Sequence, residues 1–160
     1  MKVYLSGFIN GNVIDKCTDW RKKIRSHYDH WKGGTEKYPI DWIDPLNGEK
    51  KEDISADGMV LKDIPPNALV HRDYYSVKIS DLIVANMDTF GELRPPIGTI
   101  SELAWAWELR KPIIIIADNY QYANHPFMLS FASFFVKSVD ELLEKKLINY
   151  FFKGMNSANY

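Results

Sequence analysis

The sequence has one cysteine, almost no net charge and no long apolar run, and each of these features excludes a class of protein. Cys17 stands alone among 160 residues, so one chain can build neither a disulfide framework nor a cysteine metal site. A formal net charge of −1 removes the dense field of Lys and Arg on which nucleic-acid binding depends. No apolar run approaches the roughly 18 residues that span a bilayer, and no charged-then-apolar leader opens the chain. We therefore expect a cytoplasmic protein that binds a small ligand, with no nucleic-acid or membrane partner.

Glycine patterns typical of cofactor binding are also missing. In the first loop, SGFINGN, glycines stand only at positions 7 and 11, which gives neither the dinucleotide fingerprint nor a phosphate loop ending in Gly-Lys-Ser/Thr. His27 and His30 could share a metal across one helical turn, but no acidic third ligand is evident, and a solvated helix surface is favoured. We expect no NAD, no ATP and no metal.

What the chain does contain is a regular alternation of short β-rich runs and helical stretches. Hydrophobic residues make up 46% and charged residues 26% of it, which describes one globular domain over residues 1–160. The expected strands are residues 2–6, 38–43, 81–87, 113–117 and 133–138. The expected helices follow Thr18, cover residues 67–80, follow Gly98, lie near residues 125–132 and follow Ser138.

Strand and helix alternate about five times, and this predicts an α/β fold. The expected architecture is a doubly wound, five-stranded parallel sheet with helices on both faces, of the flavodoxin-like or Rossmann-like kind. In such sheets ligands bind beyond the carboxyl ends of the strands, where the winding reverses. The loops expected to gather there are residues 6–11, 44–48, 86–99 and 118–125.

The first helix shows the clearest periodicity. Trp20, Ile24, Tyr28 and Trp31 recur at helical spacing, and Thr18 is expected to cap the helix that carries them. This stripe predicts which face of the helix packs on the sheet.

Glu102 allows two interpretations. Residues 99–102, Thr-Ile-Ser-Glu, satisfy the capping-box pattern, in which the glutamate bonds back to the amide of the cap residue. Residues 138–141, Ser-Val-Asp-Glu, have the same form. The other interpretation is that Glu102 is a catalytic group, placed where the loop after the third expected strand enters its helix.

A second acid, Asp73, bears on that choice. It lies near the middle of a helix expected to end close to Asp81, and it could equally be a surface charge paired with Arg72 or Lys78. Asp81 itself is expected to be a strand-entry residue.

Three segments, residues 3–7, 72–87 and 90–116, resemble the nucleoside 2-deoxyribosyltransferase superfamily, which includes related nucleoside and nucleotide N-glycosidases. They read VYLSG, RDYYSVKISDLIVANM and FGELRPPIGTISELAWAWELRKPIIII, and the resemblance as a whole covers most of the chain, in order and with matching spacing. The most specific part is Gly98-Thr99-x-x-Glu102, followed by a Lys-Pro turn into a strand. The resemblance implies that Glu102 is the nucleophile, that Asp73 is a catalytic aspartate and that Tyr4 orients the nucleophile.

The reaction implied is retaining glycosyl transfer with two carboxyl groups. Glu102 would attack C1′ of a (deoxy)nucleoside to give a covalent glycosyl-glutamate, while Asp73 would protonate the departing base. Attack by a second nucleobase completes deoxyribosyl transfer, which we place first. The alternative is hydrolysis of a (deoxy)nucleoside 5′-monophosphate, and a second alternative is a nucleotide-binding module without turnover.

One position departs from the family pattern. Six residues before the nucleophile, transferases often place an aspartate that reads the base, and nucleotide hydrolases often place a serine that holds a phosphate. This chain has Pro96, which offers neither group. Arg94 could hold a phosphate and Glu92 could accept from a base amino group, although the two could equally form a surface ion pair.

The resemblance also implies further substrate-binding positions and a partner copy. The residues concerned lie in the first loop, at the start of the predicted catalytic helix, near residue 125 and at the chain end: Ser6, Gly7, Phe8, Gly98, Asn124 with His125, and Tyr160. In the family, segments like the last two reach a neighbour's active site. The aromatic tail and the stretch YANHPFMLS supply apolar surface, so we expect a homodimer or a higher homo-oligomer.

Overall fold

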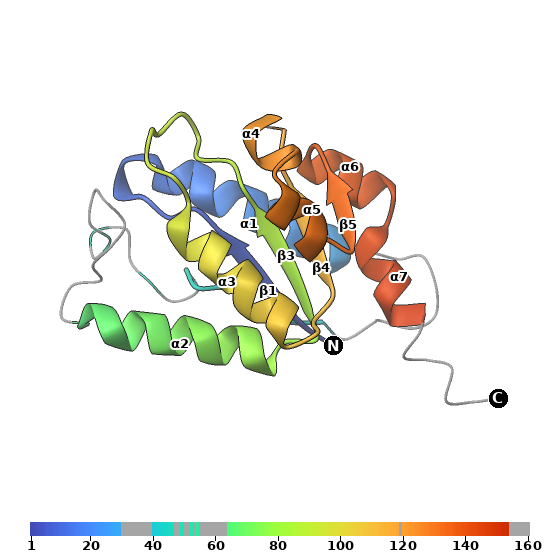
Figure 1. The fold of residues 1–160 in the computed structure, drawn as a ribbon, viewed down its shortest axis with the longest axis horizontal. Helices are drawn as coiled ribbons and strands as arrows, with labels where there is room; N and C mark the ends of the chain where they lie inside the picture. Colours follow the sequence, from blue (N-terminus) through green and yellow to red (C-terminus); the bar gives the residue numbers. More distant parts are fainter. Residues whose placement is uncertain are drawn as a thin grey trace.

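The computed structural model describes residues 1–29, 40–46, 49, 52, 54, 64–118 and 120–153, which form three layers around one parallel sheet (Figure 1). Over these residues the sheet has five strands in the order β2-β1-β3-β4-β5, and each neighbouring pair is parallel. The strands are β1 (Lys2–Gly7), β2 (Asp41–Ile43), β3 (Leu82–Asn86), β4 (Ile113–Ile116) and β5 (Phe134–Val136). The expected doubly wound sheet is confirmed, and its strand order is the flavodoxin-like one.

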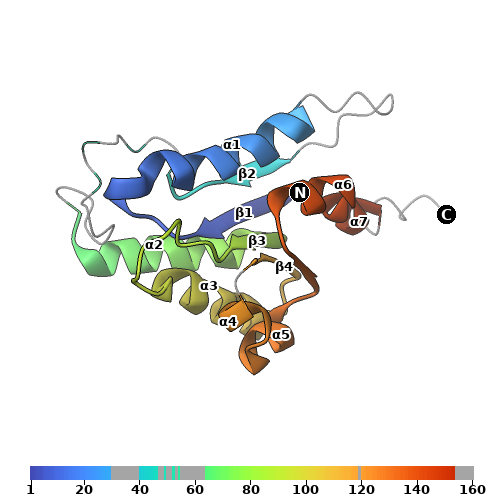
Figure 2. The same cartoon turned by 90° about the horizontal axis from the view of Figure 1, so that it is seen from above.

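Helices cover both faces of this sheet (Figure 2). One face carries α1 (Ile14–Asp29) with the 3-10 turn η1 (Gly11–Val13) before it, α6 (Val139–Glu144) and α7 (Leu147–Lys153). The other face carries α2 (Pro66–Ile79), α3 (Ile97–Glu108), α4 (Tyr120–Ala123) and α5 (Pro126–Phe131). Among the residues that the structure describes, no helix is long and apolar enough to cross a membrane.

The core consists of two apolar layers, one on each face of the sheet. Along β1, Val3 and Leu5 enter the layer that contains Ile24 of α1, whereas Tyr4 enters the layer that contains Leu103 of α3. Successive side chains of a strand point to opposite faces, so a strand covered on both sides carries mainly apolar residues along its length. This is why β3 and β4 read as the continuous runs LIVAN and IIII.

The winding of the chain reverses between β1 and β3. The chain passes from β1 through α1 to β2 at one edge, then crosses back, and β3, β4 and β5 follow one another toward the other edge. At the reversal, Gly7 at the end of β1 lies opposite Asn86 at the end of β3. Ligand sites of doubly wound sheets lie outside such a point, because the two loops leave in opposite directions there.

The start of α1 differs from the prediction. The helix begins at Ile14, after a turn in which the Asn10 side chain accepts from the Asn12 N–H at 2.8 Å. Thr18 is therefore inside the helix, where its Oγ1 donates to the Ile14 carbonyl at 2.7 Å, and its assignment as a cap is wrong. The short turn η1 carries no apolar periodicity that could have placed it in advance.

The stripe predicted for α1 is confirmed over the described part of the helix. Trp20 and Ile24 are buried, and Tyr28 packs against the same apolar layer. Trp31 lies outside the described residues. Asp81 also stands at the expected place, since its N–H donates to the Lys2 carbonyl at 2.8 Å and its carboxylate accepts from the Lys2 N–H at 2.7 Å.

Candidate active site

Glu102 lies on the buried side of α3 and does not cap that helix. α3 begins at Ile97 after Pro96, so Thr99 is already inside it and the capping-box interpretation is wrong. The Glu102 carboxylate instead accepts from two hydroxyl groups of β1. Tyr4 Oη donates to Oε1 at 2.7 Å, and Ser6 Oγ donates to Oε2.

The period of β1 explains this pair of donors. Tyr4 and Ser6 are two residues apart, so their side chains leave the same face of the strand, about 7 Å apart at roughly 3.3 Å per residue. Both are fully buried, and Glu102 is 7% exposed. A carboxylate oxygen has two lone pairs, so each oxygen of Glu102 keeps one for another contact. The two hydrogen bonds fix the orientation of the Glu102 carboxylate and leave a lone pair on each oxygen with which it can react.

Burial and neighbouring groups set the charge of Glu102. The pKa of Glu102 is raised to about 7, chiefly by burial and also by the Asp73 carboxylate, although the Ser6 and Tyr4 hydroxyls and the Arg21 guanidinium lower it. The pKa of Tyr4 is raised well above its usual value, by burial first and then by Glu102 and Asp73. Tyr4 therefore stays protonated as a donor, while Glu102 changes charge near neutral pH.

Asp73 lies on α2, which packs beside α3 on the same face of the sheet. Its Oδ1 pairs with Arg72 Nε at 3.1 Å, and its side chain is 20% exposed. Burial raises the pKa of Asp73, and Arg72 lowers it. The ion pair with Arg72 is thus present, and Asp73 is in addition near enough to raise the pKa of Glu102. The two carboxyl groups are therefore within electrostatic range of each other.

The loop after β3 contacts the loop after β1. Glu92 Oε2 accepts from Asn10 Nδ2 at 3.4 Å, and Arg94 donates to the Ile9 carbonyl at 3.1 Å. The Arg94 guanidinium also lies 5.0 Å from the centre of the Phe8 ring. Each side chain of the predicted Glu92–Arg94 ion pair therefore has a different partner in the described part of the chain. Arg94 Nε is buried and has no hydrogen-bond partner among the described residues.

The two predicted glycines differ in their surroundings. A Cβ at Gly7 would lie 2.8 Å from Trp20 Cζ2 and 3.1 Å from the Asn86 carbonyl oxygen, so the close packing of α1 and β3 requires glycine there. A Cβ at Gly98 would meet nothing within 4 Å. Nothing in the structure explains the glycine at position 98.

The remaining predicted residues lie farther along the chain. Asn124 is exposed between α4 and α5, and His125 caps α5, with its Nδ1 accepting from the Phe127 N–H at 3.3 Å. Tyr160 lies outside the described residues. Within the described ranges, no three His, Cys, Asp or Glu side chains lie close enough together to hold a metal ion.

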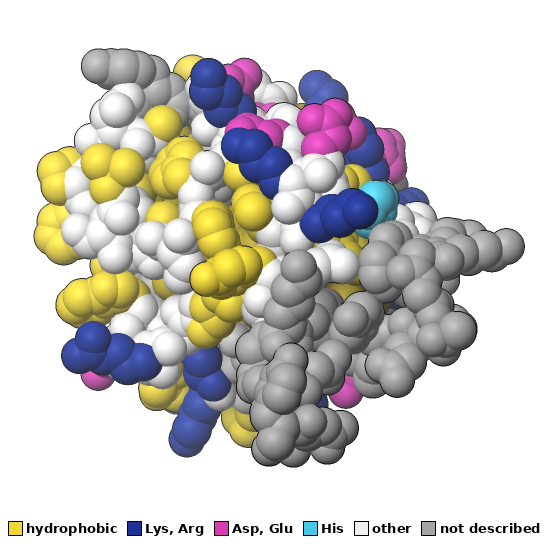
Figure 3. Space-filling view, turned by 90° about the vertical axis from the view of Figure 1, so that its right-hand side faces the viewer, with side chains coloured by type: hydrophobic (Ala, Val, Ile, Leu, Met, Phe, Trp, Pro, Cys, Tyr) yellow, Lys and Arg dark blue, Asp and Glu magenta, His cyan; other side chains and the backbone are white. Residues whose placement is uncertain are grey.

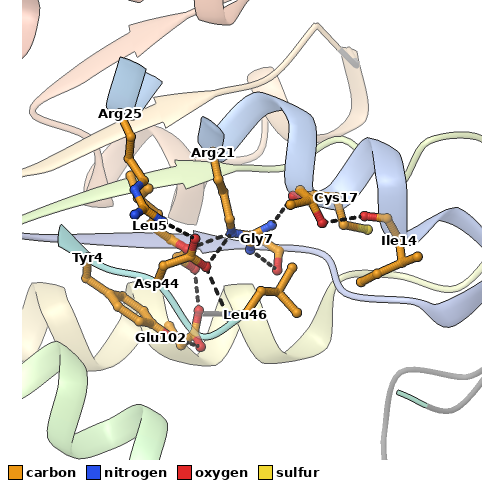
Figure 4. A network of polar contacts seen from close by, with 12 residues as sticks. Tyr4, Leu5, Gly7, Ile14, Cys17, Arg21, Arg25, Asp44, Leu46 and Glu102 are labelled. Carbon is orange, nitrogen blue, oxygen red and sulfur yellow. Dashed lines mark hydrogen bonds and ion pairs between the residues drawn. The ribbon is translucent and has the colours of Figure 1, made fainter. Parts of the chain in front are cut away.

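One buried charged residue close to β1 was not anticipated, namely Arg21 of α1. It is fully buried, and its guanidinium donates to the Leu5 carbonyl at 3.3 Å and the Gly7 carbonyl at 3.1 Å (Figure 4). Asp44, directly after β2, pairs with it at 3.5 Å. The sequence did hold a signal, because Arg21 falls on the buried stripe of α1, three residues before Ile24 and one after Trp20.

Comparisons with known proteins agree with this fold. No family model and no curated protein matches the chain. Among solved structures, it is similar to a conserved protein from Enterococcus faecalis V583, with a TM-score of 0.62, 20% identity, and coverage of 90% of this chain and 95% of that one. It is also similar to the CMP N-glycosidase BcmB from Clostridium botulinum, with a TM-score of 0.57, 16% identity, and coverage of 92% and 99%.

A third similar structure is a 2-deoxyribosyltransferase from Leishmania mexicana, with a TM-score of 0.50 and 16% identity over 74% of this chain. The chain spans 65% of that protein's length. The deoxyribosyltransferase and the N-glycosidase are members of the nucleoside 2-deoxyribosyltransferase superfamily, the family that the sequence motifs resemble. At these identities the likeness establishes the shared flavodoxin-like fold.

Proposed function

We propose that the protein cleaves the N-glycosidic bond of a (deoxy)nucleoside or its nucleotide through a covalent intermediate on Glu102. The observation that carries the proposal is the buried carboxylate of Glu102, held by the Tyr4 and Ser6 hydroxyls next to the switch point of the sheet. A second carboxyl group, that of Asp73, is near enough to raise the pKa of Glu102, which supports the proposal. Two carboxyl groups in different environments are what retaining glycosyl transfer needs.

The proposed first step divides the work between these two acids. Ionised Glu102 attacks C1′ as the bond from C1′ to the base nitrogen breaks, which leaves the sugar esterified to Glu102. The departing base takes a proton from Asp73, and burial favours the protonated form of that group by raising its pKa. In the second step Asp73 takes the proton back from the incoming nucleophile, and Glu102 is released as a carboxylate.

We keep deoxyribosyl transfer to a second nucleobase as the first candidate for the complete reaction. A specific observation favours the second candidate, hydrolysis of a nucleoside 5′-monophosphate. Arg94 has a buried Nε without a partner among the described residues, and a phosphate oxygen would satisfy it. Pro96 is buried and offers no hydroxyl for that purpose.

A chromatographic assay separates these candidates. Deoxynucleosides and deoxynucleotides are each incubated with the enzyme, with and without an acceptor base. A new nucleoside supports transfer, and free base with sugar or sugar phosphate supports hydrolysis. No product from any substrate, together with binding detected by calorimetry, would support a binding module instead and contradict the proposal.

We further propose that the protein self-associates through α5 and the end of α3. Phe127 and Leu129 of α5 are 64% and 54% exposed, and Trp107 of α3 is 49% exposed. Figure 3 shows hydrophobic side chains gathered over the left part of one face, while charged groups crowd its upper right. Sedimentation of the parent should give a dimer or larger at micromolar concentration, and Phe127→Glu with Leu129→Glu should give a monomer. A monomeric parent would contradict the proposal.

A further inference from the structure

On the side away from β3, the strand that carries Tyr4 and Ser6 has no paired strand over its last residues in the described part of the chain. β2 pairs with β1 only as far as Ile43, while β1 continues beyond that point. In the register set by the bond from the Asp41 N–H to the Met1 carbonyl (2.9 Å), the Leu5 carbonyl would need an N–H from Pro45. Proline has none, so the ladder with β2 stops, and the carbonyl groups on this side of the end of β1 have no backbone donor from β2.

Arg21 occupies the place of the missing strand. Its guanidinium donates to the carbonyls of Leu5 and Gly7, the two residues that face this side of β1, and also to the Cys17 carbonyl of its own helix. The group lies 4.4 Å from the centre of the Trp20 ring. A rigid fork of donors matches several fixed acceptors, whereas the single ammonium of a lysine does not.

Asp44 makes this buried cation tolerable. Its side chain is 5% exposed and lies 3.5 Å from Arg21 Nε, and its Oδ1 also accepts from the Leu46 N–H at 2.9 Å. Arg25 lies 3.5 Å from the other oxygen. A buried charge without a partner is strongly unfavourable, so the Arg21 guanidinium requires the Asp44 carboxylate as its partner.

We propose that Arg21 and Asp44 are positioning residues for the Glu102 nucleophile: they hold the Leu5 and Gly7 carbonyls and so fix the segment of β1 that presents Tyr4 and Ser6 to Glu102. The inference rests on the proposed role of Glu102. The guanidinium reaches β1 from α1, while Tyr4 meets Glu102 on the α3 side of the strand (Figure 4). Ser6 Oγ donates to the same carboxylate. A displacement of about 1 Å at such a site costs on the order of 10²-fold in rate.

The pair also has an electrostatic consequence with a definite sign. The groups that act on Glu102 are Tyr4 and Ser6 from β1, Asp73 from α2 and Arg21 from α1, and Arg21 lowers the pKa of Glu102. Removing the Arg21 charge must raise that pKa and move the acid limb of the kcat–pH profile to higher pH. Neutralising Asp44 leaves the cation unopposed, which moves the limb to lower pH.

The experiment compares kcat–pH profiles of Arg21→Met, Asp44→Asn and Arg21→Lys. We expect Arg21→Met to lose on the order of 10²-fold in kcat with little change in KM and to shift the limb upward, and Asp44→Asn to shift it downward. Arg21→Lys keeps the charge but not the fork, so kcat should fall while the limb stays near that of the parent. Lys23→Met is the matched control, since Lys23 pairs with Asp140 at 2.6 Å on the exposed side of α1.

The inference would be overturned if the acid limb of the kcat–pH profile shifts in the same direction in Arg21→Met and Asp44→Asn. It would also be overturned if the limb moves in neither variant. If Arg21→Met does not fold, Asp44→Asn and Arg21→Lys decide by the same criteria. If the parent turns over no nucleoside, the proposed function fails separately. Carbon-13 NMR titration of the Glu102 carboxyl group, assigned by its loss in Glu102→Gln, then tests the opposed shifts without turnover.

Discussion

Glu102 and Glu141 occupy the same position in the same sequence pattern and have opposite environments. At the start of α6, Ser138 Oγ accepts from the Glu141 N–H at 3.1 Å, and the Glu141 carboxylate accepts from the Lys137 N–H at 2.7 Å. Its hydrogen bond with Lys145 lowers the pKa of Glu141. Glu102 is buried and has a pKa raised to about 7. The pattern identifies a cap only where the helix starts at its first residue.

The two helices start differently because of the residues before them. α6 follows the extended Ser138, whose side chain is its cap. α3 follows Pro95 and Pro96, and the Ile100 N–H already donates to the Pro96 carbonyl at 3.0 Å. Glu102 is thus the sixth residue of α3, on the face that buries Leu103 and Ala106. Because the helix starts at Ile97, two residues before Thr99, Glu102 is in a core position and not in a capping position.

The same substitution at the two glutamates tests this contrast, and the largest effect is expected at Glu102. Glu102→Gln should abolish turnover by several orders of magnitude, because an amide is a far weaker nucleophile than a carboxylate. Glu141→Gln should leave turnover unchanged, since a capping box accepts glutamine. Steady-state kinetics on a confirmed substrate measures both. Mass spectrometry should find a sugar adduct on Glu102 in the parent, and near-parental turnover by Glu102→Gln would disprove its role as nucleophile.

Asp73→Asn should have the next largest effect. It removes the proposed acid-base group while Glu102 and its donors remain, so kcat should fall by about 10²–10⁴-fold. The loss should be smallest for substrates whose leaving base needs little protonation. Asp140→Asn, at the exposed pair with Lys23, is the control. Equal losses for good and poor leaving bases would argue that Asp73 acts on something other than the departing base.

The sequence predicted the fold well because its signals are local or periodic. Continuous apolar runs marked β3 and β4, and the stripe of Trp20 and Ile24 marked the buried face of α1. The motif around Glu102 directed attention to one carboxylate. Arg21 was not found, because its role depends on where β2 ends and on a carbonyl that only the sheet register identifies.

A third test concerns stability and pH. The pKa of Glu102 in the folded chain, about 7, is above the value of 4.5 for an ordinary glutamate, so the folded state binds the proton more tightly. Stability from this group is therefore present below about pH 4.5 and is lost as the pH rises to 7, by about 3 kcal/mol in total. Urea unfolding should show Glu102→Gln gaining on the parent by about that amount between pH 4.5 and pH 8.

Glu141 is expected to give the opposite pH dependence of the free energy of unfolding. Its pKa is lowered in the folded state, so its contribution is present at neutral pH and is lost as the pH falls. Glu141→Gln should not gain on the parent as the pH rises. A parent whose stability relative to Glu102→Gln is independent of pH would contradict the raised pKa of Glu102.

The smallest expected effects separate the two serines, Ser6 and Ser138. Ser138→Ala removes a helix cap and should cost about 1 kcal/mol of unfolding free energy with no change in kcat. Ser6→Ala removes a hydrogen bond to a charged group, a contribution of about 1.5–3 kcal/mol that corresponds to roughly 10- to 100-fold in rate. Because the Ser6 hydroxyl lowers the pKa of Glu102, the loss in kcat should be larger at pH 7 than at pH 9. Chemical denaturation and kcat–pH profiles of both variants measure this, and a Ser6→Ala loss that is equal at both pH values would show that the hydroxyl does not act through the charge of Glu102.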